Sequence, residues 1–228
     1  MTPNQTDLPD SKAGSDEPIR VLIVDDHPML RKGVIDLLQL EEGFQSIGEA
    51  SSGEEACEIA TKLEPDLILL DLNMKGMDGI ETIRQLRSRD IFSRIVIFSV
   101  SDNHEDVVSA LKAGADGYIL KDTEPEELVS YIQQAVNGKL AISDNLAGIL
   151  ATAIKDNNSS VNRAVENLTY REKQILSLIA SGLSNKMIAR ELTIAEGTVK
   201  VHVKNLLKKL KMRSRVEAAI WAMEQNIK

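Results

Sequence analysis

The sequence predicts an α/β domain with a doubly wound, five-stranded parallel sheet, followed by an all-α domain of four helices that includes a helix-turn-helix. Two observations support this prediction. Five short apolar runs alternate with five amphipathic stretches of helical length between residues 19 and 137, and such alternation is typical of a parallel sheet covered by helices. From residue 167 to 228, helix signals follow one another without a strand pattern between them.

The expected strands are short, and the first, third and fourth are apolar almost throughout, as in "DLILLD". Continuous apolar character indicates strands that are buried on both faces. We expect strands at 19–25, 45–50, 66–71, 94–99 and 116–121, and helices at 28–40, 53–63, 79–89, 104–113 and 125–137. By composition, 1–18 is a disordered tail, 19–137 the α/β domain, 138–166 a linker in which 143–154 could form a short helix, and 167–228 the helical domain.

The helical domain is predicted from caps and from one short turn. Two residue pairs have the spacing of a capping box at a helix start, Thr169 with Glu172 and Ser214 with Glu217. Between them, the segments 184–191 and 196–211 are joined by the turn "LTIA". A helix, a tight turn and a longer basic helix form the outline of a helix-turn-helix.

Charge divides the chain in two. Residues 167–228 hold 12 Lys/Arg and 5 Asp/Glu, a balance of +7, whereas residues 1–166 hold the remaining 15 Lys/Arg and 30 Asp/Glu, a balance of −15. A basic half next to an acidic half favours nucleic acid as the partner of the basic half, although a basic face can also be merely solvated.

Cysteine content and hydropathy exclude several classes of protein. The single cysteine, Cys57, excludes an intramolecular disulfide and a cysteine-based zinc site, and it is interpreted as a small core residue of a helix. The longest apolar runs are too short to cross a bilayer, and the N-terminus lacks a secretory signal pattern. We therefore expect a cytoplasmic protein.

Polar side chains follow the strands of the predicted sheet. They are Asp25 and Asp26 after the first strand, Asp71 after the third, Ser99 at the end of the fourth and Lys121 at the end of the fifth. The carboxyl ends of parallel strands meet at one edge of the sheet, where sites gather. Carboxylates held together raise one another's pKa unless a cation lies among them, and oxygen ligands suit Mg²⁺. We expect a magnesium site at which one carboxylate accepts a phosphoryl group, with Lys121 and Ser99 contacting its oxygens.

The alternative is that these acids cap helices. Asp26 or His27 before Pro28 is an N-cap signal, and His27 is interpreted as a cap or turn residue. Asp71 is different, because "LNMKGMDG" separates it from a helix that begins near Gly79. Capping explains part of the set, and the set as a whole favours a site.

The basic helix of the second domain has two distinct faces at 100° per residue. Val199, Val203, Leu206, Leu207 and Leu210 form the expected core stripe, and Lys200, Lys204, Lys208 and Lys211 lie on the other side. Val201 lies among the lysines, which suits contact with a thymine methyl group in the major groove. The alternative is a solvated charged helix with one stray valine. Phosphate contacts are expected near helix starts, from Ser184, Asn185, Lys186, Arg190 and Thr198.

The segments "VDDHPMLRKGV" (24–34), "DLILLDLNMKGMDGIE" (66–81), "IVIFSVSD" (95–102) and "AGADGYILKD" (113–122) resemble the flavodoxin-like receiver domain of two-component response regulators. The resemblance implies that Asp71 is the phosphoacceptor. It also implies that Asp26, Asp71 and the backbone carbonyl of Asn73 bind Mg²⁺, while Asp25 acts through a coordinated water. Ser99 and Lys121 would contact the phosphoryl group, and Tyr118 matches the aromatic residue that reorients on activation.

Residues 168–219 resemble the LuxR-type four-helix DNA-binding domain, so the whole chain is similar to the NarL/FixJ family of response regulators. The resemblance places Lys200, Val201 and Lys204 at groove-facing positions. The final helix, with an expected apolar face at Val216, Ala219, Ile220 and Met223, would pack in the core or mediate dimerisation. The partners implied are a sensor histidine kinase, a double-stranded DNA operator bound by a homodimer, and RNA polymerase.

Within this family, "DLNMKGM", "NKMIAR" and "VKVHVKNLLKKLK" are similar to the nitrate- and nitrite-responsive regulators, which implies control of anaerobic respiration genes. Two positions depart from the family pattern. Lys75 stands where many receivers carry proline, and Ala195 stands where relatives have a Ser or Thr cap, a loss of about 1 kcal/mol unless Thr193 or Glu196 compensates.

Three function classes compete. The leading hypothesis is a transcription regulator, not an enzyme, in which phosphorylation of Asp71 relieves masking of the DNA-binding domain by the acidic receiver. An aspartyl-phosphate hydrolase would favour an acid two residues after the nucleophile, where this chain has Asn73. A constitutive DNA-binding protein with a degenerate receiver is disfavoured by the complete set of site residues.

Overall fold

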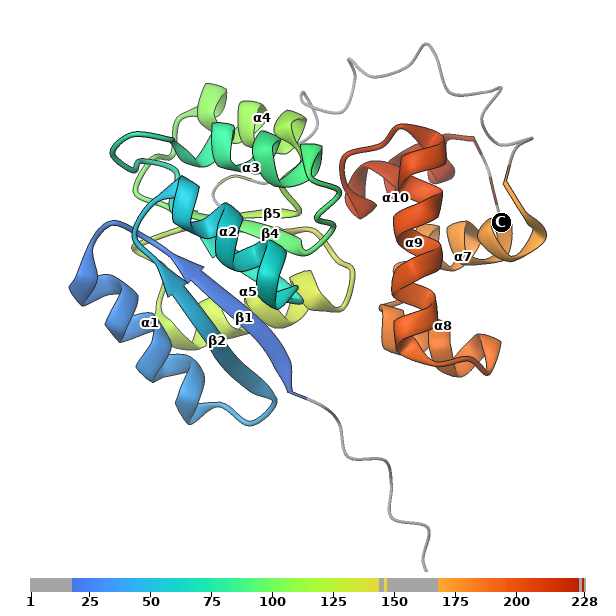
Figure 1. Cartoon of the computed structure of the whole chain (residues 1–228), viewed down its shortest axis with the longest axis horizontal. Helices are drawn as coiled ribbons and strands as arrows, with labels where there is room; N and C mark the ends of the chain where they lie inside the picture. The colour runs from blue at the N-terminus through green and yellow to red at the C-terminus, as the bar shows by residue number, and fades with distance from the viewer. Residues whose placement is uncertain (1–17, 144–145, 147–167, 226, 228) are drawn as a thin grey trace, which may run out of the picture.

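The computed structural model describes residues 18–143, 146, 168–225 and 227, which form two units with separate apolar cores (Figure 1). We call them the sheet domain and the helical domain. The expected tail, apart from Pro18, lies outside the described residues, as do the polar linker and all of the expected short helix at 143–154 except Ser143 and Leu146. None of the described helices is long and apolar enough to cross a membrane.

The sheet domain contains a parallel sheet in the order β2-β1-β3-β4-β5-β6. Its strands are β1 (Ile19–Val24), β2 (Phe44–Ala50), β3 (Leu67–Leu70), β4 (Arg94–Ser99), β5 (Gly117–Leu120) and β6 (Ala141–Ile142). The doubly wound parallel sheet is confirmed, but the expected number of five strands is wrong. The sixth strand has two residues, which is too short to show a strand period in the sequence.

Helices cover both faces of the sheet (Figure 1). α1 (Pro28–Leu40) and α5 (Pro125–Val136) pack on one face, and α2 (Gly53–Leu63), α3 (Gly79–Ser88) and α4 (His104–Ala113) on the other. The strands alternate accordingly: Ile68 and Leu70 of β3 pack toward α2, α3 and α4, whereas Leu67 and Leu69 pack toward α1 and α5. Because both faces are buried, the strand is apolar at every position. Cys57 is buried in α2, as expected.

The helical domain consists of α7 (Tyr170–Ala180), α8 (Asn185–Leu192), α9 (Glu196–Leu210) and α10 (Arg215–Glu224). The capping box of Thr169 and Glu172 is present at the start of α7. At α10 the predicted box is only half formed: Ser214 accepts from the Glu217 N–H, but the Glu217 carboxylate accepts from the Arg213 N–H at 2.7 Å. The start of α9 has no side-chain cap, so nothing replaces the missing hydroxyl at Ala195.

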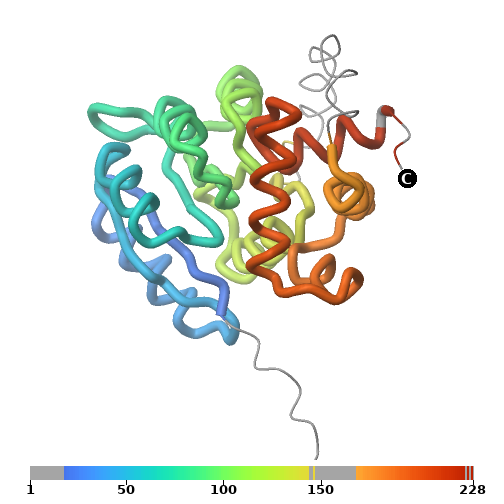
Figure 2. Tube along the Cα trace, turned by 45° about the vertical axis from the view of Figure 1, so that its right-hand side comes forward, coloured from blue at the N-terminus to red at the C-terminus, as the bar shows by residue number. Residues whose placement is uncertain are grey.

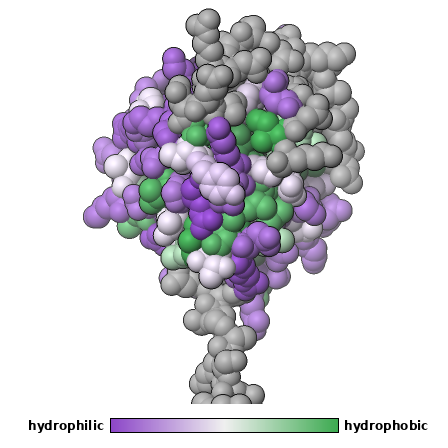
Figure 3. Space-filling view, turned by 90° about the vertical axis from the view of Figure 1, so that its right-hand side faces the viewer, coloured by the Kyte–Doolittle hydropathy of each residue, from purple (hydrophilic) through white to green (hydrophobic). Residues whose placement is uncertain are grey.

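The buried face of α10 agrees only in part with the expected one: Val216 is buried and Ala219 packs against the core, as expected. Ala218, Trp221 and Ala222 are buried in the core of the helical domain, while Met223 is 64% exposed. α10 is apolar around much of its circumference, so its periodicity does not define one face. On the side of the molecule formed by this domain, apolar surface lies between charged side chains (Figure 3).

A buried ion-pair network lies at the amino ends of β4 and β5. Asp116 accepts hydrogen bonds from Arg87 Nη2 at 2.9 Å, Arg94 Nη1 at 3.2 Å and the Ile95 N–H at 3.1 Å. Arg87 also donates to the carbonyl groups of Gly114, Ile91 and Ser93. Burial lowers the pKa of Arg87, and the charge of Asp116 opposes this. The network fixes the loops that precede both strands.

Replacing Asp116 with alanine is expected to lower the free energy of unfolding by about 3–5 kcal/mol, because two buried guanidinium groups lose their carboxylate. Urea unfolding followed by circular dichroism measures this. The control is Glu58→Ala, an exposed acid of α2, which should change stability by no more than about 0.5 kcal/mol. A loss below about 1 kcal/mol for Asp116→Ala would show that the network contributes little.

Candidate functional site

The structure brings the predicted ionisable residues together at the carboxyl edge of the sheet. Lys121 Nζ lies 2.8 Å from Asp25 Oδ2 and 2.9 Å from Asp71 Oδ2, and all three side chains are buried. Ser99, the last residue of β4, is also buried. One ammonium group between two carboxylates offsets the repulsion that would otherwise separate them.

Asp71 is held at this edge by the backbone around it. Its N–H donates to the Val24 carbonyl at 2.8 Å, which continues the ladder between β3 and β1. The chain then turns closely past the aspartate: a Cβ atom on Gly79 would lie 2.5 Å from the Asp71 carbonyl oxygen, so glycine is needed there. Asp78, not Asp71, caps α3, which agrees with the interpretation that Asp71 is not a cap.

Burial and Lys121 shift the pKa of Asp71 in opposite directions. Burial raises the pKa of this carboxyl group above its usual value, and the hydrogen bond and charge of Lys121 oppose the shift. The Asn73 N–H also donates to Asp71 Oδ1, at 3.3 Å. A desolvated carboxylate whose Oδ2 is paired with a lysine presents its other oxygen as a nucleophile or ligand.

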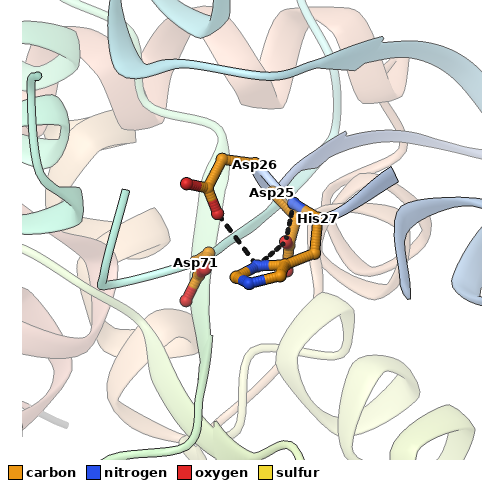
Figure 4. Close-up of side chains that lie close together, drawn as sticks. All are labelled: Asp25, Asp26, His27 and Asp71. Carbon is orange, nitrogen blue, oxygen red and sulfur yellow. Dashed lines mark hydrogen bonds and ion pairs between the residues drawn. The ribbon is translucent and has the colours of Figure 1, made fainter. Parts of the chain in front are cut away.

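His27 lies at the expected cap position of α1, but it does not cap the helix with its side chain. Its Nδ1 lies 2.9 Å from Asp26 Oδ1 and 3.2 Å from Asp25 Oδ1, so the imidazole faces the carboxylates (Figure 4). Asp26 does not cap α1 either; its Oδ1 is buried without a hydrogen-bond partner among the described residues.

The carboxylates fit a divalent cation. Ligand atoms of Asp25, Asp26, His27 and Asp71 all lie within 4.8 Å of one another. Asp26 Oδ1 is a buried anionic oxygen that lies 2.9 Å from His27 Nδ1 without forming a hydrogen bond, and a cation would stabilise it. Carboxylate oxygens suit Mg²⁺, which would neutralise charge on a phosphoryl group. Asp26 and Asp71 are the direct ligands that we expect, with Asp25 behind them.

Tyr118 of β5 lies close to Ser99, the last residue of the neighbouring strand β4. Its side chain is completely buried. Its hydroxyl donates to the Ser101 carbonyl at 2.8 Å, and Ser99 Oγ accepts from the Ser101 N–H at 3.1 Å. Burial raises the pKa of Tyr118. The tyrosine and the serine therefore both contact the loop between β4 and α4.

α9 lies on the side of the helical domain that faces the sheet domain (Figures 1 and 2), and two lysines of its basic face are paired with acids there. Lys200 Nζ is 2.5 Å from Asp66 Oδ1, and Lys208 Nζ is 3.0 Å from Asp90 Oδ2. Phe92, from the loop before β4, packs against the core of the helical domain. The core stripe of α9 is buried as predicted, and Val201 is 57% exposed.

The other residues predicted to contact DNA differ in their surroundings. Ser184 is buried and caps α8 through the Met187 N–H, and Asn185 Oδ1 accepts from Arg215 at 2.8 Å. Both side chains thus have structural partners within the helical domain. Three more of the predicted residues, on α9 and at its end, are exposed: Thr198, Lys204 and Lys211. The last two, Lys186 and Arg190, belong to α8.

Two family matches cover most of the chain. Residues 21–133 match the family described as Response regulator receiver domain, and residues 166–222 match Bacterial regulatory proteins, luxR family. The chain belongs to the two-component response regulators of the NarL/FixJ family. The sheet domain is therefore a receiver domain, and the helical domain is a LuxR-type DNA-binding domain.

Several relatives match this regulator over nearly its full length. It is 54% identical to the nitrate/nitrite response regulator protein NarL of Escherichia coli K12, over 92% of this chain and 98% of that protein. It is 44% identical to NarP of the same organism, over 91% and 96%. Among solved structures, the response regulator ChrA of a heme-sensing two-component system is 30% identical with a TM-score of 0.50, covering 92% of this chain and 99% of that chain. A LuxR-family regulator from Aurantimonas sp. SI85-9A1 is 34% identical with a TM-score of 0.57, over 60% and 97%.

Sequence reasoning missed the imidazole of His27 at the acidic site and the receiver residues Asp66, Asp90 and Phe92 that meet the DNA-binding domain. For His27, the signal was its position directly after two strand-end aspartates. For the other three, no local pattern marks which surface residues of one domain will contact another. Lys75 is exposed in the loop after Asp71, and nothing in the structure explains its departure from the family pattern.

Replacing Asp26 with asparagine is expected to weaken Mg²⁺ binding by at least about 10–100-fold, the range measured for residues that only support a ligand. The change removes the one buried carboxylate oxygen of the site that lacks a hydrogen bond. Isothermal titration calorimetry measures the affinity, with the exposed Asp36→Asn of α1 as control. Equal affinities for both variants would place the cation elsewhere.

Proposed function

We propose that this response regulator is a transcription factor switched on by phosphorylation of Asp71. The observation that carries the proposal is the buried Asp71 carboxylate, which is paired with Lys121 and lies beside Asp25 and Asp26. A carboxylate oxygen of Asp71 would attack the phosphorus of a phosphohistidine on a sensor kinase. The P–N bond breaks, the leaving imidazole nitrogen takes the electron pair and is protonated from water, and Asp71 becomes an acyl phosphate.

The surrounding residues would stabilise the transferred group. Lys121 would leave Asp71 Oδ2 to pair with a phosphoryl oxygen, and the Ser99 hydroxyl would donate to another. Mg²⁺, held by Asp26, Asp71 and the Asn73 carbonyl, would supply countercharge. When Ser99 turns toward the phosphoryl group, its hydrogen bond to the Ser101 N–H is lost, and we expect the Tyr118–Ser101 contact to change with it.

The contacts of α9 support masking as the means of control. Lys200, a predicted base-reading residue, and Lys208 are both paired with acids of the receiver. DNA would have to compete with Asp66 and Asp90 for these two ammonium groups, whereas Val201 and Lys204 of the same helix are exposed. Phosphorylation would shift the population toward an arrangement in which α9 is free, provided the phosphoryl group stabilises that arrangement more than the present one.

The similarity to NarL favours nitrate and nitrite as the signal, sensed by the kinase, and genes of anaerobic respiration as targets. Once released, the DNA-binding domain would bind a two-fold operator as a homodimer and would act on RNA polymerase at the promoter. Two-fold operators follow from the general geometry of helix-turn-helix dimers. The exposed Met223 of α10 is available for such a dimer.

Asp71→Asn should abolish labelling by a radioactive acyl phosphate, because the amide is no nucleophile. Asp36→Asn, which changes an exposed acid of α1, should be labelled like the unaltered protein. Mass spectrometry of the labelled protein locates the modification. Undiminished labelling of Asp71→Asn would refute the assigned acceptor.

Lys204→Ala should weaken DNA binding by about 1–3 kcal/mol if Lys204 contacts a base edge. Fluorescence anisotropy measures the affinity, with a duplex selected from a random library by residues 161–228. The matched control is Lys173→Ala, which removes the same charge from an exposed position of α7. If both variants bind equally well, Lys204 lies outside the interface.

A fragment of residues 161–228 should bind this duplex without phosphorylation, because it lacks Asp66 and Asp90, which pair with Lys200 and Lys208 of α9. Its core is its own apart from Phe92, so we expect it to fold. Its affinity should exceed that of the unphosphorylated full chain. A folded fragment that binds no better than the full chain would count against masking.

A further inference from the structure

The two domains meet at the edge of the sheet opposite the phosphorylation site. Asp66, Asp90 and Phe92 lie in the loops that precede β3 and β4, and the Lys112 carbonyl, which accepts from Arg213 at 2.6 Å, precedes β5. The phosphorylation site lies at the carboxyl ends of the same strands. Any coupling between them must therefore run along the length of the sheet.

The segment 138–143, which contains the short strand β6, extends from one edge of the sheet to the other. At its amino side, Gly138 turns back from α5 and adjoins the turn between α7 and α8: a Cβ atom on Gly138 would lie 3.3 Å from the Leu183 carbonyl oxygen and 3.4 Å from the Gly182 carbonyl oxygen. At its carboxyl side, Ser143 is buried against the end of β5. No other described segment after α5 belongs to the receiver sheet.

Ser143 is hydrogen-bonded to Tyr118 and to Leu120, the residue before Lys121. Ser143 Oγ accepts from the Leu120 N–H at 3.1 Å, and the Ser143 N–H donates to the Tyr118 carbonyl at 3.1 Å. Leu120 directly precedes Lys121, whose ammonium group bridges Asp25 and Asp71. We therefore expect a movement of Lys121 toward a phosphoryl group to strain the hydrogen bonds between Ser143 and β5.

Docking of β6 also depends on one glycine of β5. A Cβ atom on Gly117 would lie 2.5 Å from the Ala141 carbonyl oxygen and 3.0 Å from Ala141 Cβ. Any side chain at this position would push β6 away from the sheet. Beyond β6, Leu146 is buried in the same core cluster as Tyr118, so the attachment of this segment extends past the strand.

We propose that the segment 138–143, docked on β5 through β6, helps to hold the DNA-binding domain against the receiver, and that phosphorylation acts by loosening this docking. The proposal rests on the proposed function, since it assigns the route from Asp71 to α9. It places two discrete contacts, Gly117 against Ala141 and Ser143 against Leu120, between the two sites. Coupling through β6 can be tested by a substitution that weakens the β5–β6 contact without changing the phosphorylation site or α9.

The test is Gly117→Ala in the full-length chain. Unphosphorylated Gly117→Ala should bind the selected duplex at least about 5-fold more tightly than the unaltered chain, the lower end of typical coupling between sites. Phosphorylation should then add less than it does to the unaltered chain. Hydrogen exchange should show lost protection over 139–143, and acyl phosphate labelling of Asp71 should continue.

The matched control is Gly33→Ala in α1, where an added Cβ atom meets nothing within 4 Å; its DNA affinity should not change. Should Gly117→Ala fail to fold, Ser143→Ala removes only the acceptor of the Leu120 N–H and should give a smaller gain in the same direction. Folded variants that bind DNA as weakly as the unaltered chain, and respond fully to phosphorylation, would overturn the role of β6. An unaltered chain that gains no affinity on phosphorylation, beside a tighter-binding Gly117→Ala, would instead contradict the proposed function and leave the β6 contact standing.

Discussion

Lys121 between Asp25 and Asp71 is the interaction on which the site depends. Three charged side chains are buried together there, and each carboxylate is 4% exposed or less. Without the ammonium group, the two adjacent carboxylates would repel each other in a desolvated pocket. A phosphoryl group that attracts the same ammonium group therefore disturbs an arrangement in which every partner is already engaged.

The same electrostatic logic applies to α9. Its lysines have two kinds of anionic partner available, the receiver acids Asp66 and Asp90 and the phosphates of DNA. Each exposed ion pair contributes little by itself, about 0.2–1 kcal/mol, so the ion pairs alone do not hold the domains together. Phe92, the carbonyl contact of Arg213 and the turn at Gly138 add non-ionic contacts to the same interface. A modest shift in free energy can release such an interface, as a switch requires.

Much of this arrangement was predictable from local patterns. The continuous apolar run of β3 and the carboxylate that ends it predicted both the buried strand and the place of Asp71, since parallel strands bring their carboxyl ends together. The core stripe of α9 followed from its period, and the cap of α7 from Thr169 and Glu172. These features depend on neighbours in the chain, which a sequence displays directly.

The features that sequence reasoning missed depend on tertiary contacts. β6 exists because Gly117 leaves room for Ala141, and a two-residue strand has no period of its own. The face of α10 was only partly predicted because the helix is apolar around much of its circumference, so its neighbours decide what is buried. The imidazole of His27 faces the acids rather than the helix end, which its neighbour Pro28 did not indicate.

If phosphorylation at Asp71 separates α9 from the receiver, the distance between the two domains must increase, and this distance can be measured. Spin labels at Glu58→Cys of α2 and Lys173→Cys of α7, with Cys57 replaced by alanine, report that distance by double electron–electron resonance. We predict one narrow distribution in the unphosphorylated protein and a longer, broader one after addition of Mg²⁺ and beryllofluoride, a phosphoryl mimic. The change should vanish in Asp71→Asn. An unchanged distribution in protein shown by ¹⁹F NMR to have bound beryllofluoride would contradict the account.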